Sequence, residues 1–131
     1  MKNNIDELLQ KPYWIIDILP EQVPKDSPGH FFEIERFFLE RSNLASIKRK
    51  HINMLLKLNC YYQLSIDDEV NPSPERIVDV VMERSLQIMV GDAMIASEPD
   101  DLYMTVYNPD EKLIKIITAI SSGEGLFVWK P

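Results

Sequence analysis

The sequence contains few of the residues that form the disulfides or metal sites of many small proteins. Its 131 residues include one cysteine, two histidines and four glycines. A lone cysteine excludes an intramolecular disulfide, which is typical of proteins in a reducing cytoplasm. Two histidines and one cysteine also provide no ligand set for a structural zinc ion. We therefore predict neither a metal nor a cofactor.

Long apolar runs are missing as well. The longest early one, 13–19, is interrupted by Asp17 and is shorter than the roughly 20 apolar residues that cross a bilayer. The first twelve residues carry acids where a signal peptide has an apolar core. Phosphate-binding loops, the zinc-protease motif and the nucleophile elbow are absent too. We expect a cytoplasmic protein that does not associate with membranes, and no enzyme class is indicated.

The composition that is present is that of a folded domain. Hydrophobic residues make up 45% of the chain and charged residues 27%, which are values typical of globular proteins. A chain of this length buries about two-thirds of its unfolded surface, so it needs no covalent staple. We find no internal repeat and no linker, and we predict a single domain over 1–131.

Charge is distributed unevenly along the chain. Residues 1–66 hold nine Lys/Arg and eight Asp/Glu, a sum of +1, whereas residues 67–131 hold five and thirteen, a sum of −8. The stretch 41–66 has five bases and no acid, and 67–101 has ten acids against two bases. The total of −7 disfavours nucleic-acid binding, because phosphates would be repelled. The acidic half would instead attract a basic protein partner.

Apolar spacing and capping signals predict five helices. A short helix begins after Asn4, and two longer ones cover 29–41 and 43–60 with a junction at Ser42-Asn43. The phenylalanine-rich helix 29–41 is expected to be buried on more than one side and to be the main core element. Ser73 and Pro74 predict a helix over 74–85. A last helix starts at Asn108-Pro109-Asp110-Glu111, and Gly123 is expected to end it in a left-handed conformation.

Six segments have the composition of strands, namely 13–19, 61–66, 86–90, 93–97, 102–107 and 126–130. Gly91-Asp92 suits a tight turn between two of them. The strands of 86–107 follow one another without helices, which indicates an antiparallel meander. We therefore predict an α+β fold, a mostly antiparallel sheet of five or six strands with about five helices packed on it, in preference to a parallel α/β fold.

Two segments, YWIIDILPEQVP near the start and GLFVWKP at the end, are similar to those of small bacterial proteins grouped as a family of unknown function. The resemblance implies a bacterial, cytoplasmic, single-domain protein. It implies no activity and no catalytic residues.

Asp17 is the residue least suited to pure packing. It interrupts an apolar strand, on the face shared with Tyr13, Ile15 and Leu19. A carboxylate on a covered face needs a partner or has a raised pKa, and such groups are common at functional sites. The alternatives are a partly open face, or a structural pairing with a Lys or Arg.

Three further residues are weighed as reactive groups. His51 lies on the apolar face of the helix 43–60, and His30 lies at the start of the phenylalanine-rich helix. For His51, a general base or metal ligand would have such a place, and so would a hydrogen-bonded histidine at the edge of a core. At His30 the helix dipole disfavours a charged ring, and the alternative there is a histidine without a functional role. Cys60 has no partner for a known nucleophile class, so we expect a buried, inert thiol.

Charged surfaces supply the remaining candidates for binding, in the form of two acidic turns that contain Asp67, Asp68 and Glu69, and Glu98, Asp100 and Asp101. Neither turn has the order of a calcium loop, so the alternatives are a partner-binding surface and simple solvation. Arg49, Lys50 and Lys57 form a basic face. It either contacts an anion, an acidic protein or a nucleic acid, or it is solvated or paired with the chain's own acids.

Two functional hypotheses follow. The first is a non-enzymatic binding or regulatory module with an acidic interaction surface, whose partner is another protein or a second copy of itself. The second is a small enzyme with a site around Asp17 and His30 or His51 that has no sequence signature.

Overall fold

Seven strands and five helices follow one another along residues 5–131, the part of the chain that the computed structural model describes. The helices are α1 (Ile5–Leu8), α2 (Phe31–Leu39), α3 (Arg41–Leu58), α4 (Pro74–Glu83) and α5 (Glu111–Gly123). The strands are β1 (Tyr13–Asp17), β2 (Ser65–Ile66), β3 (Glu69–Val70), β4 (Leu86–Val90), β5 (Ala93–Ser97), β6 (Met104–Tyr107) and β7 (Phe127–Trp129). The predicted cap Asn4 lies outside the described residues. No helix within residues 5–131 is both long and apolar enough to cross a membrane.

All seven strands belong to one antiparallel sheet in the order β3-β2-β4-β5-β6-β1-β7. The meander β4-β5-β6 is formed as predicted, and Gly91 adopts a φ of 58° in its first turn. β1 comes from the start of the chain and lies between β6 and β7. The α+β prediction is confirmed, with seven strands in the described residues instead of five or six.

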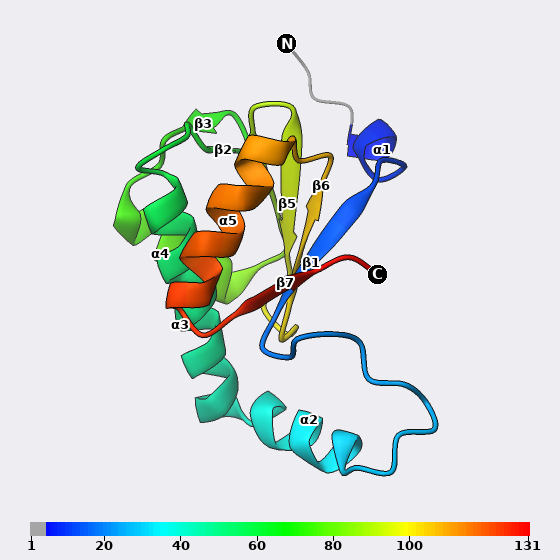
Figure 1. The fold of residues 1–131 in the computed structure, drawn as a ribbon. Helices are drawn as coiled ribbons and strands as arrows, with labels where there is room; N and C mark the ends of the chain where they lie inside the picture. The colour runs from blue at the N-terminus through cyan, green and yellow to red at the C-terminus, as the bar shows by residue number, and fades with distance from the viewer. Residues whose placement is uncertain (1–4) are drawn as a thin grey trace.

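The helices α3, α4 and α5 lie together on one side of this sheet (Figure 1). Paired strand residues Ile88, Ile95 and Val106 point into the layer between helices and sheet, where each is less than 1% exposed. The alternate residues Tyr13, Tyr107 and Met89 point to the opposite face, which these three helices leave open. The protein therefore has two layers, with one face of the sheet available for contacts.

Helix α2 departs from the prediction that it would be the main core element. None of its residues is buried, and Phe32 and Phe37 are 77% and 53% exposed. It packs on the start of α3 and projects away from the sheet (Figure 1). The central core helix is α3, in which Ile52 and Leu55 are completely buried. Apolar spacing predicts which face of a helix is to be covered, but not which chain covers it.

Three boundaries also differ from the predictions. Residues 61–64 are not strand, because the amides of Tyr61 and Tyr62 both bond to the Leu58 carbonyl and prolong the end of α3 as turns. Glu40 separates α2 from α3, so the junction precedes the predicted Ser42-Asn43. Gly123 is still helical, and the left-handed residue after α5 is Gly125, with a φ of 81°.

Candidate functional site

Asp17 lies at the end of β1, on the open face of the sheet, and its side chain is half-buried. It lines a cleft of about 310 Å³ together with residues from the sheet, from the segment after β1 and from α2. A second cavity of about 70 Å³ continues beneath α2 and shares Asp17, Phe31, Glu35 and Tyr103 with the first. We call the larger space the Asp17 cleft.

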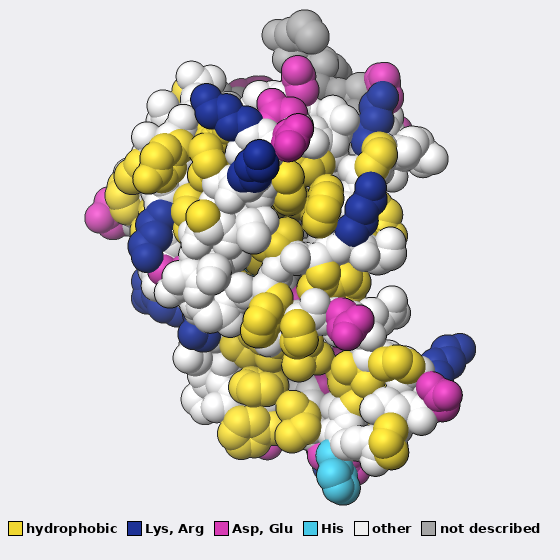
Figure 2. Space-filling model, viewed as in Figure 1, with side chains coloured by type: hydrophobic (Ala, Val, Ile, Leu, Met, Phe, Trp, Pro, Cys, Tyr) yellow, Lys and Arg dark blue, Asp and Glu magenta, His cyan; other side chains and the backbone are white. Residues whose placement is uncertain are grey.

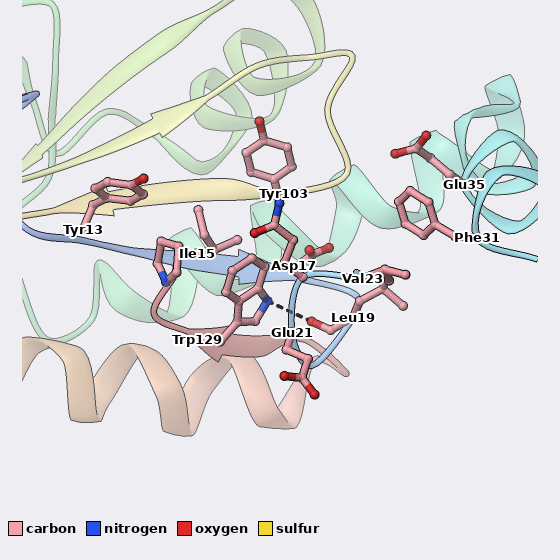
Figure 3. A pocket seen from close by; sticks show the side chains of 12 residues that line it. Tyr13, Ile15, Asp17, Leu19, Glu21, Val23, Phe31, Glu35, Tyr103 and Trp129 are labelled. Atoms are coloured by element: carbon pink, nitrogen blue, oxygen red, sulfur yellow. Dashed lines mark hydrogen bonds between the residues drawn. The ribbon is translucent and has the colours of Figure 1, made fainter. Parts of the chain in front are cut away.

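The side chains around the Asp17 cleft are of two kinds. Figure 3 shows Asp17 and Tyr103 near its centre, Tyr13 and Ile15 toward one end, and Phe31 and Glu35 of α2 on the opposite side. Its lining includes three carboxylates and four aromatic rings, from Asp17, Glu21, Glu35, Tyr13, Phe31, Tyr103 and Trp129. None of the described lining residues is Lys, Arg or His. Carboxylates and aromatic faces both attract cations.

The sheet holds the floor of the cleft in place. Ile15 pairs with Trp129, and Asp17 with Phe127, so β7 fixes the position of β1. The indole Nε1 of Trp129 also donates a hydrogen bond of 3.1 Å to the Leu19 carbonyl, drawn in Figure 3. This bond ties the end of the chain to the segment that leaves β1 and forms one wall.

The electrostatics of Asp17 match its place in a cleft. Burial raises the pKa of its carboxyl, and the charge of Glu35 raises it further, while backbone hydrogen bonds from Leu19 and Ile18 act in the opposite direction. The Ile18 amide donates to Oδ1 at 2.7 Å. Within residues 5–131, no Lys or Arg forms an ion pair with Asp17. The face is partly open, and the carboxylate has no cationic partner from the described chain.

Neither histidine lines this cleft, although His30 directly precedes its lining residue Phe31. His30 precedes α2, its side chain is 84% exposed, and its closest acid is Glu33 at 3.7 Å. His51 is completely buried in the core, and neither ring nitrogen has a hydrogen-bond partner in the described chain. Burial, followed by the charge of Lys48, lowers the pKa of His51 to about 3, and the Leu102 backbone offsets only part of this. The structure thus does not bring Asp17 together with a histidine.

Lys48 is the residue that sequence reasoning missed. It is 1% exposed, and its Nζ donates to the carbonyl oxygens of Glu98 at 2.7 Å and Asp101 at 3.5 Å. Burial lowers its pKa to about 8, although the carboxylates of Asp101, Glu98 and Asp100 act in the opposite direction. The acidic turn 98–101 therefore surrounds a buried cation of its own chain. The only signal in the sequence was that the basic stretch 41–66 is followed by the acidic stretch 67–101.

The other acidic turn is partly neutralised as well. Asp67 pairs with Arg84 at 2.6 Å, and Glu69 pairs with Arg76 at 3.3 Å. Asp67 and Asp68, with φ of 51° and 45°, form the tip of the β2–β3 turn and line a depression of about 880 Å³ at the far end of the open sheet face. Two of the three acids of this turn are thus engaged within the chain.

The basic face of α3 pairs in part with the chain's own acids. Glu124, just after α5, accepts hydrogen bonds from Lys57 and from Asn53, and its carbonyl accepts one from Lys50 at 3.0 Å. Bonding to Lys57 lowers the pKa of the Glu124 carboxyl. These contacts fasten α5 to α3 and leave Arg49 exposed.

Cys60 is exposed, so the expectation of a buried thiol is wrong. It follows the end of α3, where the chain turns outward, and its Sγ lies 3.7 Å from the Leu56 carbonyl. No group of three or more His, Cys, Asp or Glu side chains that could hold a metal ion occurs among residues 5–131.

Comparison with known proteins gives no relative. No family model, no curated protein and no solved structure matches the chain. The resemblance of the two segments to a bacterial family stays a prediction.

Proposed function

We propose that the protein is a non-enzymatic, cytoplasmic binding module whose Asp17 cleft receives a positively charged side chain of a protein partner. The observation that supports this is the lining of the cleft, with three carboxylates, four aromatic rings and no cation among its described residues. Its volume, about 310 Å³, is at the lower end of the range for ligand sites.

An arginine suits this lining best. Its planar guanidinium binds carboxylates through paired hydrogen bonds and also stacks on aromatic rings. Asp17 is half-buried and has no cationic partner among residues 5–131, and its raised pKa reflects the cost of holding the charge there. A bound guanidinium would supply the missing counter-charge.

The other candidates have less geometric support. An enzyme centred on Asp17 and a histidine needs the two groups within hydrogen-bonding reach, and neither histidine lines the cleft. The acids of 67–101 include Asp67 and Glu69, which have their own ion pairs, and the turn that surrounds Lys48. The acidic interaction surface is therefore assigned to the cleft instead of these turns.

The test uses the position of Trp129 in the cleft. A Trp14→Phe background leaves Trp129 as the only tryptophan of the chain and hence as a reporter. We expect the peptide Gly-Gly-Arg-Gly-Gly to change its fluorescence, and the same peptide with neutral citrulline to have no effect. Asp17→Asn should weaken arginine-peptide binding about tenfold, as expected for the loss of one charge-assisted contact.

Asp68→Asn is the matched control, since it removes an exposed carboxylate at the other end of the same face. Equal weakening by both substitutions would indicate a general charge effect and contradict a specific cleft. Equal binding of the arginine and citrulline peptides would contradict the proposal altogether.

A further inference from the structure

Helix α2 has an outer face that nothing in the described chain covers. Its inner residues Phe31, Ile34, Glu35 and Phe38 line the 70 Å³ cavity next to the body. At 100° per residue, Phe32, Glu33, Arg36 and Phe37 occupy the opposite side, and all four are exposed. A helix that is apolar on both sides is normally buried, yet α2 has no buried residue. Figure 2 shows hydrophobic side chains gathered over α2 at the bottom of the view.

The sequence of this outer face is symmetric about its centre. The midpoint lies between Ile34 and Glu35. Phe31-Phe32-Glu33 stands before it, and Arg36-Phe37-Phe38 stands at the same distance after it in mirrored order, with Arg36 in the place opposite Glu33. If two antiparallel α2 helices are related by a two-fold axis through that midpoint, residues equally distant from it lie level with each other. Phe32 is then level with Phe37 of the second copy, and Glu33 with Arg36 of the second copy. Each contact occurs twice, and each charged contact joins opposite signs.

We propose that the protein forms a homodimer in which the outer faces of two α2 helices pack antiparallel. Charge supports a second copy as the occupant. Residues 31–41 hold three acids and two bases, whereas 67–101 holds ten acids and two bases. A molecule of net charge −7 associates with itself most easily where its surface is apolar and nearly neutral. Within residues 5–131 Arg36 forms no ion pair, so it is available for Glu33 of the second copy.

The dimer does not depend on the proposed binding function. The inner face of α2 lines the Asp17 cleft, and the outer face forms the interface, so the cleft stays accessible in both copies. Peptide binding and dimerisation can each fail without the other.

Light scattering coupled to gel filtration, over a series of concentrations, tests the dimer. We expect the wild type to approach twice the 15.3 kDa of one chain. Glu33→Arg alone or Arg36→Glu alone sets like charges against each other twice per dimer. Each should raise the dissociation constant roughly tenfold or more. The double variant E33R/R36E restores opposite signs at both contacts and should dimerise nearly as well as the wild type.

Glu83→Arg, an equivalent change at an exposed position of α4, is the matched control and should leave the mass unchanged. Circular dichroism verifies that each variant is folded. A wild type that stays monomeric at every concentration overturns the proposal. So does a dimer that is indifferent to the single substitutions, or one that the double variant disrupts as much as either single change, because only the antiparallel two-fold contact predicts the rescue.

Discussion

Replacing Lys48 by Met separates two opposing consequences of burying its ammonium group. The substitution keeps the length and the apolar stem of the side chain. It removes the charged donor of the Glu98 and Asp101 carbonyls, a loss of about 1.5–3 kcal/mol for hydrogen bonds that involve a charged group, while the Asp101 amide still donates to the Glu98 carbonyl. It also removes a charge that burial disfavours, as the lowered pKa of Lys48 shows.

The magnitude follows from that pKa, which moves from 10.5 to about 8. At about 1.4 kcal/mol per pH unit, the buried charge is disfavoured by about 3 kcal/mol. The two effects nearly cancel at pH 7, where we expect Lys48→Met to lie within about 2 kcal/mol of the wild type. The dependence on pH is more informative than this difference.

Between pH 8 and pH 10.5, folded Lys48 has lost its proton while the unfolded chain retains it. The unfolded state then binds more protons, so the contribution of Lys48 to the free energy of unfolding rises with pH. Relative to Lys48→Met, the wild type should gain about 1.4 kcal/mol per pH unit across this window, and about 3 kcal/mol in all.

Urea unfolding of both proteins at pH 7, 8, 9 and 10 measures this difference, and groups that titrate equally in both proteins cancel. Lys112→Met, on the exposed side of α5, controls for the removal of a lysine in general. A constant difference between the free energies of unfolding of the wild type and of Lys48→Met from pH 8 to 10 would refute the reasoning. Such a result would mean that folding does not lower the pKa of Lys48.

Three further predictions concern stability. Burial lowers the pKa of His51 from 6.5 to about 3, so the wild type should lose on the order of 5 kcal/mol relative to His51→Leu as the pH drops through that range. Urea midpoints of the two proteins that stay parallel over this range would contradict this. Gly125→Ala should lower the free energy of unfolding by about 1–2 kcal/mol, because φ is 81° and the new Cβ would lie 3.3 Å from Lys50 Nζ. Gly29→Ala is the control and should change this free energy little, because Gly29 has no positive φ. Asp17→Asn should raise the thermal midpoint at pH 7, since a raised carboxyl pKa means that ionisation of Asp17 weakens the fold. The rise in the midpoint should fade below pH 3.8, where Asp17 is protonated in both states. A lower midpoint for Asp17→Asn at pH 7 would count against this prediction.

Local chemistry made several elements predictable from the sequence. The Ser73 hydroxyl accepts from the Arg76 amide at 3.1 Å, and the Asp110 carboxylate accepts from the Leu113 amide at 2.7 Å, so both helix starts are capped as their residue types indicated. The Gly91 turn of the meander depends on equally local rules. These three features were decided within a few residues and were predicted correctly.

Features that are decided by contacts between distant residues were not predicted correctly. The pattern of α2 is that of a helix to be covered, and it does not distinguish the chain's own core from another molecule. A lysine at position 48 is expected to be exposed, and only the carbonyls of a turn fifty residues away make its burial possible. The left-handed residue after α5 is Gly125 instead of Gly123, and Glu124 between them bonds to Lys50 and Lys57 of α3.

For the candidate site, the sequence singled out Asp17 because one carboxylate interrupted an apolar strand. It could not indicate that Trp129, Tyr103 and Glu35 would gather around this residue. They come from β7, from the segment before β6 and from α2, and only the strand order places them together. The sequence placed His51 on a helix face and His30 at a helix start, and neither residue lines the cleft around Asp17.

The position of β1 in the sheet has a consequence for synthesis of the chain. Among the strands of the described residues β1 is synthesised first, but both of its neighbours, β6 and β7, are synthesised after all the other strands. Ile15 finds Trp129 only when nearly the whole described chain has emerged. The nascent chain can form α3 early, yet the apolar residues of β1 must remain unpaired for most of translation. Since pairings between distant residues slow folding, this step is the one at which a chaperone would have the longest time to act.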